Sequence, residues 1–406
     1  MKNIFMAYYR ASLILKISVA LVLGIIAGFL LGEQAAHLAP LGDLLLRLLT
    51  FLIIPLILFT LIVGVNQTNI ANLGRMGSKV FIYYTVTSAL AIIVGLLVAS
   101  ILRPGTGMHL TGNETFDVPE NPGIIHVLLN IVPSNIATAF TEMNLLGIIF
   151  TALAFGIAIS VMRSSEKHGG LGDSLLTNVT ALNEASLIIL KAILQYVPIG
   201  IFAIIANTVG SQGIDTLVSL GGMIGVFYIA LLVHIVLYII LLLLFGIKPG
   251  PFFKYARTPM ITAFVTQSST GTLPLTLDAA KKMGIPKSLY GFSLPLGATV
   301  NMDGAAIRIA VSAVFAANVA GTPLTIPDML MVVLIGTLAS IGTAGVPGAG
   351  IVMIATVFVQ LGLPMEAVAL LTAIDALVGM GATMLNITGD LVGTKLIAQQ
   401  EQRRKT

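Results

Sequence analysis

The sequence has no cysteine and little charge, since only 9% of its 406 residues are Asp, Glu, Lys or Arg. The absence of cysteine excludes disulfides, thiol chemistry and cysteine-ligated metals. A typical soluble protein has about 25% charged residues, so this chain has too little polar surface to remain in water. Hydrophobic residues make up 57% of it, and its mean hydropathy is +1.01. We therefore expect a polytopic membrane protein with no nucleic-acid partner.

Histidine is also sparse, and its five copies are scattered without the spacing of a metal site. A membrane-embedded hydrolase would need a nucleophile and a base, for which Ser268 or Ser269 with His234 is conceivable. The chain has no G-x-S-x-G turn, and the sequence offers His234 no orienting partner. We interpret His234 as a packing residue. A passive channel would show a repeated pore-lining motif, which the sequence lacks, so we expect neither an enzyme nor a channel.

Apolar segments long enough to cross a bilayer recur along the chain. Eight full spans are predicted at about 12–31, 41–65, 79–102, 124–163, 177–209, 216–246, 287–318 and 364–397. The first is expected to be a retained helix, because no cleavage site followed by a soluble domain is present. An even number of spans places both termini on the same side of the membrane.

Basic residues should gather on the side that carries the termini. They are Lys2, Arg10, Arg75, Lys79, Arg163, Lys167, Lys248, Lys254, Arg257, Arg403, Arg404 and Lys405. The opposite loops are predicted to be acidic. The positive-inside rule then places both termini in the cytoplasm. Short loops and the lack of a compartment signal favour the plasma membrane of a prokaryote.

Two further apolar segments, at about 250–283 and 324–362, are interrupted by small and polar residues. One contains VTQSSTGTLP and the other ASIGTAGVPGAG, each between apolar arms about half a bilayer long. Irregular backbone in lipid must be buried in protein or line a cavity. We therefore predict two re-entrant hairpins whose tips meet near the midplane, a pattern that marks transporter binding sites. Two surface loops between short helices are the alternative, although the arms are too apolar for water.

Polar residues also interrupt the predicted spans at NMDG (301–304) and NITGD (386–390). Glycines on either side of Asn301 would permit an unwound backbone with free carbonyl oxygens. Asn386 and Asp390 are four residues apart and share a helical face. Carbonyl, amide and carboxylate oxygens are ligands for a small hard cation. Counting both motifs and both hairpins, we predict four polar backbone breaks around a cation site. A structural ion pair or a protonated core acid is the alternative for each Asp.

These motifs, in this order and spacing, resemble the dicarboxylate/amino acid:cation symporter family, the glutamate transporter homologues. The resemblance implies an all-α membrane protein of eight transmembrane helices and two re-entrant helical hairpins, assembled as a homotrimer in the lipid bilayer. It implies a scaffold formed by residues 1–78 and 124–209. A transport domain of residues 79–102 and 216–397 would carry substrate by an elevator movement, with the second hairpin as its gate.

The resemblance also implies sodium as coupling ion, with up to three sites. The first would use carbonyls of Gly297, Asn301 and Asn386 with the Asp390 carboxylate. The second would use carbonyls of Thr299, Met302, Ser340, Ile341 and Thr343. The third would use Tyr84, Thr87, Ser88, Asn301 and Asp303. A proton-coupled member is the alternative.

The substrate pocket departs from the amino acid carriers of the family. The resemblance places Gly379 where those carriers have an Asp for the substrate ammonium, and Ala382 where acidic carriers have an Arg. Burying an ammonium without a counter-charge costs several kcal/mol, so we expect a substrate without an α-amino group. Arg308 could instead bind a carboxylate, facing Gly379 and Ala382. The predicted pocket residues are Gln267, Ser268, Ser269, Arg308, Thr343, Val346, Gly350, Gly379, Ala382, Thr383 and Asn386.

The predicted substrate is therefore a small C4-dicarboxylate such as malate, succinate or fumarate. Arg308→Ala is expected to abolish its transport and to spare the fold. In the alternative reading, Arg308 only forms a structural bridge with Asp375. A sodium-coupled acidic or neutral amino acid symporter is the alternative function, and both meet the objection that Gly379 cannot balance an ammonium.

Overall fold

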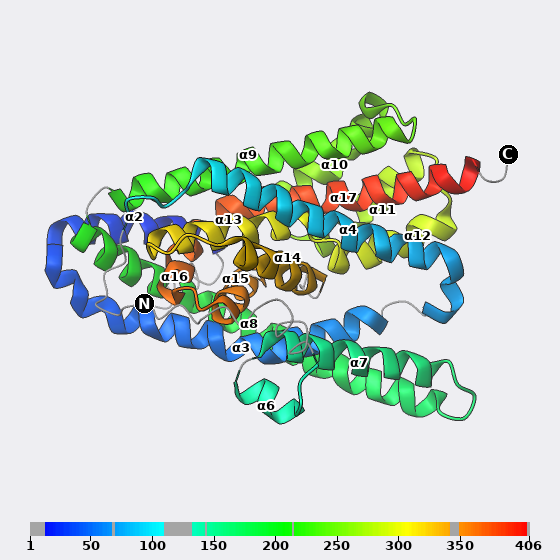
Figure 1. The fold of residues 1–406 in the computed structure, drawn as a ribbon, viewed down its shortest axis with the longest axis horizontal. Coiled ribbons are helices and arrows are strands. Elements are labelled where there is room, and N and C mark those ends of the chain that lie inside the picture. Colours follow the sequence, from blue (N-terminus) through cyan, green and yellow to red (C-terminus); the bar gives the residue numbers. More distant parts are fainter. Residues whose placement is uncertain are drawn as a thin grey trace, which may run out of the picture.

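The computed structural model describes residues 13–66, 70–108, 132–142, 144–212, 215–341 and 349–403, and every regular element within these ranges is helical. The first half contains α2 (Leu13–Leu31), η1 (Gly32–Leu38), α3 (Ala39–Asn66), α4 (Ile70–Leu102), α6 (Ile136–Thr141), α7 (Leu145–Arg163) and α8 (Gly169–Gln212). The second half contains α9 (Asp215–Leu244), α10 (Pro249–Thr266), α11 (Ser269–Lys282), α12 (Lys287–Val300), α13 (Asp303–Val319), α14 (Ile326–Ile341), α15 (Ala349–Leu361), α16 (Met365–Ala373) and α17 (Asp375–Arg403). The long helices run roughly parallel to one another (Figure 1).

The prediction of an all-helical membrane protein is confirmed. Among the described residues, six helical stretches are long and apolar enough to cross a membrane, and further apolar helices, α7 among them, are shorter. The predicted span at 124–163 is not one helix, because its part from 132 onward contains the short helix α6, a turn and then α7. The side-chain amides of Asn135 and Asn144 cap these two helices at their N-termini. Residues 124–131 lie outside the described ranges.

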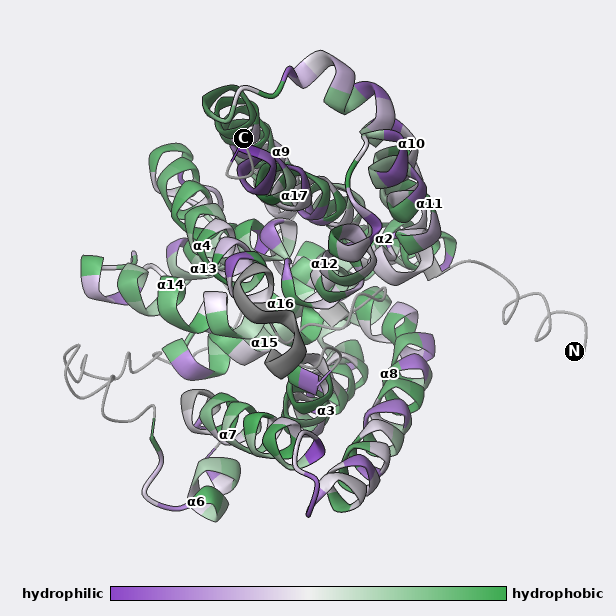
Figure 2. Ribbon diagram, turned by 90° about the vertical axis from the view of Figure 1, so that its right-hand side faces the viewer, coloured by the Kyte–Doolittle hydropathy of each residue, from purple (hydrophilic) through white to green (hydrophobic). Residues whose placement is uncertain are grey.

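The helices pack in two groups. The first consists of α2, α3, α7 and α8, with α8 packed along both α2 and α3. The second contains α13 and α17 at its centre, packed against each other and against α4 and α9, with α10, α11 and α12 beside α17. Seen along the long axis, α3, α7 and α8 lie to one side of the molecule and the α9–α13 and α17 helices to the other, with α15 and α16 between them (Figure 2).

The predicted break at NMDG is confirmed. Helix α12 ends at Val300 and α13 begins at Asp303, and the two residues between them have non-helical backbone angles. The predicted break at NITGD is wrong, because Asn386 and Asp390 lie within the continuous helix α17. The helical conformation is instead interrupted before α17 begins, at Ile374 between α16 and α17. An uninterrupted helix there keeps Asn386 and Asp390 on the same face, as their spacing requires.

Both interrupted apolar segments form pairs of helices. Helices α10 and α11 pack against each other and meet at Gln267 and Ser268, and α14 packs against α15. At the first tip, the Ser268 hydroxyl caps α11 by accepting a hydrogen bond from the Gly271 amide at 3.0 Å. The tip between α14 and α15 lies outside the described residues, so the predicted meeting of the two tips stays a prediction.

Several of the basic residues predicted to share one side lie at one end of the molecule. The Lys79 ammonium, near the start of α4, is 2.7 Å from the Glu401 carboxylate near the end of α17. The guanidinium of Arg403 donates to the carbonyl of Phe245 after α9, at 2.8 Å. The turn that follows Arg163 between α7 and α8 lies at this same end (Figure 1). The structure therefore brings together basic residues that are far apart in the sequence.

Candidate cation and substrate site

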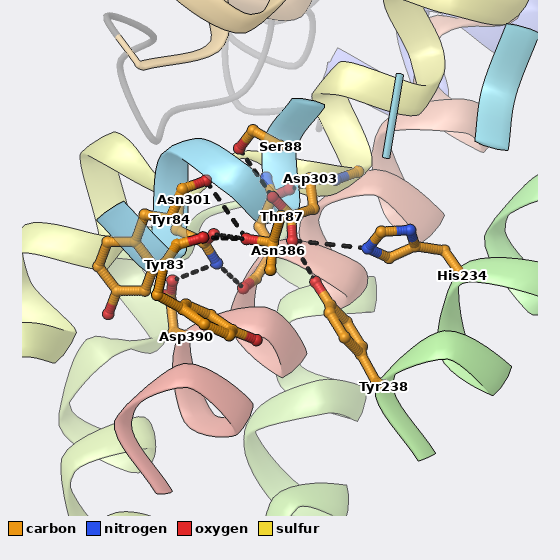
Figure 3. Close-up of polar contacts among 11 residues, drawn as sticks. Tyr83, Tyr84, Thr87, Ser88, His234, Tyr238, Asn301, Asp303, Asn386 and Asp390 are labelled. Carbon is orange, nitrogen blue, oxygen red and sulfur yellow. Dashed lines mark hydrogen bonds and ion pairs between the residues drawn. The ribbon is translucent and has the colours of Figure 1, made fainter. Parts of the chain in front are cut away.

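Asn301 links the break between α12 and α13 to two other helices, α4 and α17. Its side-chain amide donates to Asp390 Oδ1 at 3.0 Å and to the Asn386 carbonyl at 3.4 Å, both on α17. Its side-chain oxygen accepts from the Thr87 hydroxyl of α4 at 3.3 Å. Asn301 is fully buried. The structure therefore places residues of two predicted sodium sites around a single amide (Figure 3).

Asp303, the first residue of α13, is fully buried and receives hydrogen bonds on both oxygens. The Ser88 hydroxyl of α4 donates to Oδ1 at 2.8 Å. The Tyr238 hydroxyl of α9 donates to Oδ2, and His234 Nε2 lies 3.6 Å from the same oxygen. The interpretation of His234 as a packing residue is confirmed, since its buried ring packs edge-on against Tyr238 at 4.7 Å, and the ring also faces Asp303 (Figure 3).

Asp390 differs from Asp303 in having one oxygen without a partner. Its Oδ1 accepts from Asn301, whereas no donor within the described part of the chain reaches the buried Oδ2. Gly297 of α12 lies directly against this carboxylate, so that an added Cβ would collide with it. The Tyr84 hydroxyl beside it is already used, donating to the Ser293 carbonyl at 2.9 Å. A buried carboxylate with an unused oxygen is costly unless a cation joins it or a proton neutralises it.

The donors around these two carboxylates suit a hard cation. Among the described residues, no group of three or more His, Asp or Glu side chains could hold a metal ion. Apart from His234, the neighbouring groups are hydroxyl, amide and carbonyl oxygens, which are ligands of hard cations and not of zinc or copper. Two carboxylates make the site negatively charged, but the described residues do not include the three or more ligating side chains that hold a structural metal tightly.

The second predicted sodium site is only partly within the described residues. The Thr299 hydroxyl donates to the Leu296 carbonyl at 3.0 Å, and the Ser340 hydroxyl donates to the Thr337 carbonyl at 2.8 Å. The Met302 sulfur accepts from the Asn386 amide at 3.1 Å. The side chain of Ile341 and all of Thr343 lie outside the described residues, so this site stays a prediction.

Arg308 forms the buried ion pair that was the alternative to a substrate contact. Its Nη2 lies 2.5 Å from Asp375 Oδ1, and both side chains are about 95% buried, with exposed fractions of 6% and 5%. Nη1 also lies 2.5 Å from where a Cβ on Gly350 would be. The guanidinium thus lies between the first turn of α17 and the start of α15. No Arg308 atom lies within 4 Å of where a Cβ on Gly379 would be, and a position of the guanidinium beside Ala382 stays a prediction.

Other residues occupy the space beside Gly379 and Ala382. The Gln267 side-chain oxygen lies 2.6 Å from where a Cβ on Gly379 would be, and the Gly304 backbone lies against Ala382. The Asn386 side-chain oxygen accepts from the Gly304 amide at 2.7 Å. Thr383 donates to the Gly379 carbonyl at 2.9 Å. Of the other predicted pocket residues, Ser269 is buried at the first hairpin tip, and Val346 lies outside the described residues.

Tyr238→Phe is expected to weaken cation binding about tenfold, the typical effect of removing a hydrogen-bond partner of a metal ligand. The Tyr238 hydroxyl fixes Asp303 Oδ2 and leaves Oδ1 facing α4. The measurement is the sodium concentration that gives half-maximal thermal stabilisation of the detergent-solubilised protein. Tyr228→Phe is the matched control, because the Tyr228 hydroxyl, also on α9, donates to Leu377 away from this cluster. Equal shifts in both variants would contradict the assignment.

Comparison with known proteins gives one family over nearly the whole chain. The sequence model of the "Sodium:dicarboxylate symporter family" matches residues 13–400. The "Proton/sodium-glutamate symport protein" of Bacillus subtilis is 32% identical over 95% of this chain and 92% of its own. The "C4-dicarboxylate transport protein" of Deinococcus radiodurans is 34% identical over 96% of this chain and 89% of its own. The "Proton/glutamate-aspartate symporter" of Escherichia coli is 29% identical over 99% of this chain and 95% of its own.

Proposed function

The chain belongs to the sodium:dicarboxylate symporter family, and we propose that it is a sodium-coupled symporter of a small C4-dicarboxylate that has no α-amino group. The family consists of transporters and not of enzymes. Relatives of similar identity are named for glutamate and for C4-dicarboxylates, so the family alone does not decide the substrate. The observation that carries the proposal is the neutral surface at Gly379 and Gln267.

The absence of a carboxylate at this point opposes an amino acid substrate. An ammonium bound beside Gly379 would meet the neutral amide of Gln267, which can accept a hydrogen bond but cannot balance a charge. The nearest described acid on this helix, Asp375, is paired with Arg308. Burying an uncompensated cation would cost several kcal/mol. A substrate with two carboxylates and no amine avoids this cost.

The two carboxylates of the substrate would bind on opposite sides of the neutral surface at Gly379 and Gln267. Ser269 and the first hairpin tip, with Thr383 and Asn386, would hold one carboxylate, and the Arg308 guanidinium would hold the other. Arg308 remains available for this despite Asp375, because a guanidinium has five N–H donors and can bridge two anions. The remaining predicted pocket residues, Ser268, Thr343, Val346 and Gly350, would close the pocket from the two hairpins.

Sodium is proposed as the coupling ion because hard oxygen donors lie beside both buried carboxylates and Asp390 Oδ2 is unpaired within the described residues. Gly297, Asn301, Asn386 and Asp390 would hold one ion. A second would lie among Tyr84, Thr87, Ser88, Asn301 and Asp303, and a third among Thr299, Met302, Ser340, Ile341 and Thr343. Bound sodium ions would neutralise Asp303 and Asp390. Because these negative charges would otherwise repel an anionic substrate, the substrate would bind only after the ions.

The two groups of packed helices are proposed to move relative to each other during transport. The α2, α3, α7 and α8 group would be a stationary scaffold, covering residues 1–78 and 124–209. The group around α13 and α17 would be the moving transport domain, residues 79–102 and 216–397, in an elevator mechanism with two re-entrant hairpins. We further propose a homotrimer in a prokaryotic plasma membrane, with both termini cytoplasmic, because basic residues gather at the end of the molecule where α17 ends.

Uptake into proteoliposomes tests this function. Under an inward sodium gradient, we expect labelled malate or succinate to accumulate and labelled aspartate, glutamate and serine to be ignored. Replacing external sodium by choline should abolish accumulation. Strong aspartate uptake without dicarboxylate uptake would refute the substrate assignment, and would favour the second candidate, an acidic amino acid symporter like the relatives named for glutamate. Uptake that persists without sodium and follows a pH gradient would refute the coupling ion.

A further inference from the structure

Gln267 has a backbone conformation that its residue type rarely adopts. It ends α10 with φ 53° and ψ 30°, in the left-handed region. A non-glycine residue is held there only where the surrounding structure determines it. The Gln267 amide N–H closes the last turn by donating to the Ala263 carbonyl at 2.9 Å. The first hairpin therefore turns at a residue whose side chain is aimed by a constrained backbone.

The side chain of Gln267 is buried but unused. Its exposed fraction is 8%, and its Oε1 lies against Gly379 of α17. Within the described part of the chain, no group forms a hydrogen bond with its carboxamide. Its Oε1 and Nε2 are not among the fully buried polar atoms that lack a partner, so both keep some accessible surface, and a glutamine offers both a donor and an acceptor. The carboxamide is thus a polar group presented to the pocket.

The register of α17 places this carboxamide at the middle of the proposed substrate. Asp375, Gly379, Thr383 and Asn386 follow one another at helical spacing on one face. Gly379 is four residues, about 6 Å, from the level of the Arg308–Asp375 pair and the same distance from that of Thr383. A dicarboxylate held by Arg308 at one end and by Thr383 and Asn386 at the other would turn its central carbons toward Gly379 and Gln267.

We propose that Gln267 hydrogen-bonds a hydroxyl group on the central carbons of the substrate, so that the transported class is 2-hydroxy dicarboxylates. This inference rests on the proposed dicarboxylate function and names the substrate class of that site. A hydroxyl both donates and accepts, and so can satisfy the carboxamide, whereas the methylene of succinate leaves it unpaired. Sites that hydrogen-bond a substrate hydroxyl discriminate against the analogue that lacks it.

The test is competition for sodium-driven uptake in proteoliposomes. The inhibition constants of unlabelled malate and succinate are measured against labelled malate, for the wild type and for Gln267→Met. Methionine keeps the length and the unbranched shape of glutamine and removes its hydrogen bonds. The wild type is expected to favour malate over succinate at least about tenfold. In Gln267→Met this ratio should fall toward one.

A second variant, Gly379→Ala, and a control variant, Thr266→Val, test the same preference for malate over succinate. Gly379→Ala places a Cβ 2.6 Å from Gln267 Oε1, so it should displace the carboxamide and lower the ratio in the same direction. Thr266→Val is the control, because Thr266 is exposed at the same tip and its hydroxyl donates to Thr262; its ratio should match the wild type.

The possible results separate the two proposals. Equal affinities of the wild type for malate and succinate, or an unchanged ratio in Gln267→Met and Gly379→Ala, would overturn the role of Gln267 and leave the dicarboxylate function standing. Transport of neither acid, with uptake of an amino acid instead, would overturn both. A malate preference that is lost in Gln267→Met, retained in Thr266→Val and lowered in Gly379→Ala would support the inference.

Discussion

Replacing Asp390 with asparagine is expected to abolish sodium-driven uptake and to raise the sodium concentration for half-maximal stabilisation at least on the order of 100-fold. The expectation follows from the unpaired Oδ2 of this buried carboxylate. Asparagine keeps the size of the side chain and its contact with Asn301, but it removes the charge that attracts the cation. The measurement is thermal unfolding of the detergent-solubilised protein over a sodium titration, together with uptake.

The same substitution should have the opposite effect when sodium is absent. A buried carboxylate without a counter-ion is unfavourable, so Asp390→Asn should be at least as stable as the wild type in choline chloride. Asp278→Asn is the control, because Asp278 is exposed and paired with Lys282; it should leave the sodium titration unchanged. If Asp390→Asn retained wild-type sodium sensitivity, the assignment of Asp390 as a cation ligand would be wrong.

Arg308→Ala is expected to abolish dicarboxylate uptake and also to destabilise the fold by about 3–5 kcal/mol, the usual cost of removing one partner of a buried ion pair. The sequence alone predicts that this variant spares the fold. The contact between Arg308 and Asp375 overturns that part, because alanine would strand a carboxylate that is only 5% exposed. The free energy of unfolding in denaturant, measured beside uptake, shows both effects.

The structural and binding roles of Arg308 can be separated by removing both charges. Arg308→Met combined with Asp375→Asn leaves no stranded charge, so stability should return close to that of the wild type. Uptake should remain absent, because methionine cannot bind a carboxylate. If the double variant accumulated dicarboxylate as the wild type does, Arg308 would be a structural bridge only, and the proposed pocket would lose its second anion site.

The features that could be predicted from the sequence are those that neighbouring residues in the chain determine. Polar residues between glycines at 301–304 indicated a break in an apolar helix, and the structure has that break. The spacing of Asn386 and Asp390 indicated one face, and both side chains meet the 301–304 segment. The NITGD motif was wrongly expected to break its helix, because the polar residues there find partners in neighbouring helices and need no unwound backbone.

Contacts between distant elements could not be predicted in this way. His234 and Tyr238 are four residues apart and so share a face of α9, but their spacing does not say which helix lies opposite. Only the packing of α9 against α13 brings them to Asp303. The sequence left two partners possible for Arg308, a substrate carboxylate or Asp375. The contact with Asp375 depends on where α17 begins. The contact of Gln267 with Gly379 depends likewise on the register of the first hairpin against α17.

Calorimetric titration of the purified protein tests the central claim, that a neutral surface at Gly379 selects a doubly anionic substrate whose binding requires sodium. Malate titrated in sodium chloride should give saturable heat, and the same titration in choline chloride should give none. Aspartate should give no saturable heat in either salt. Saturable binding of aspartate in sodium chloride, with none for malate, would contradict the account.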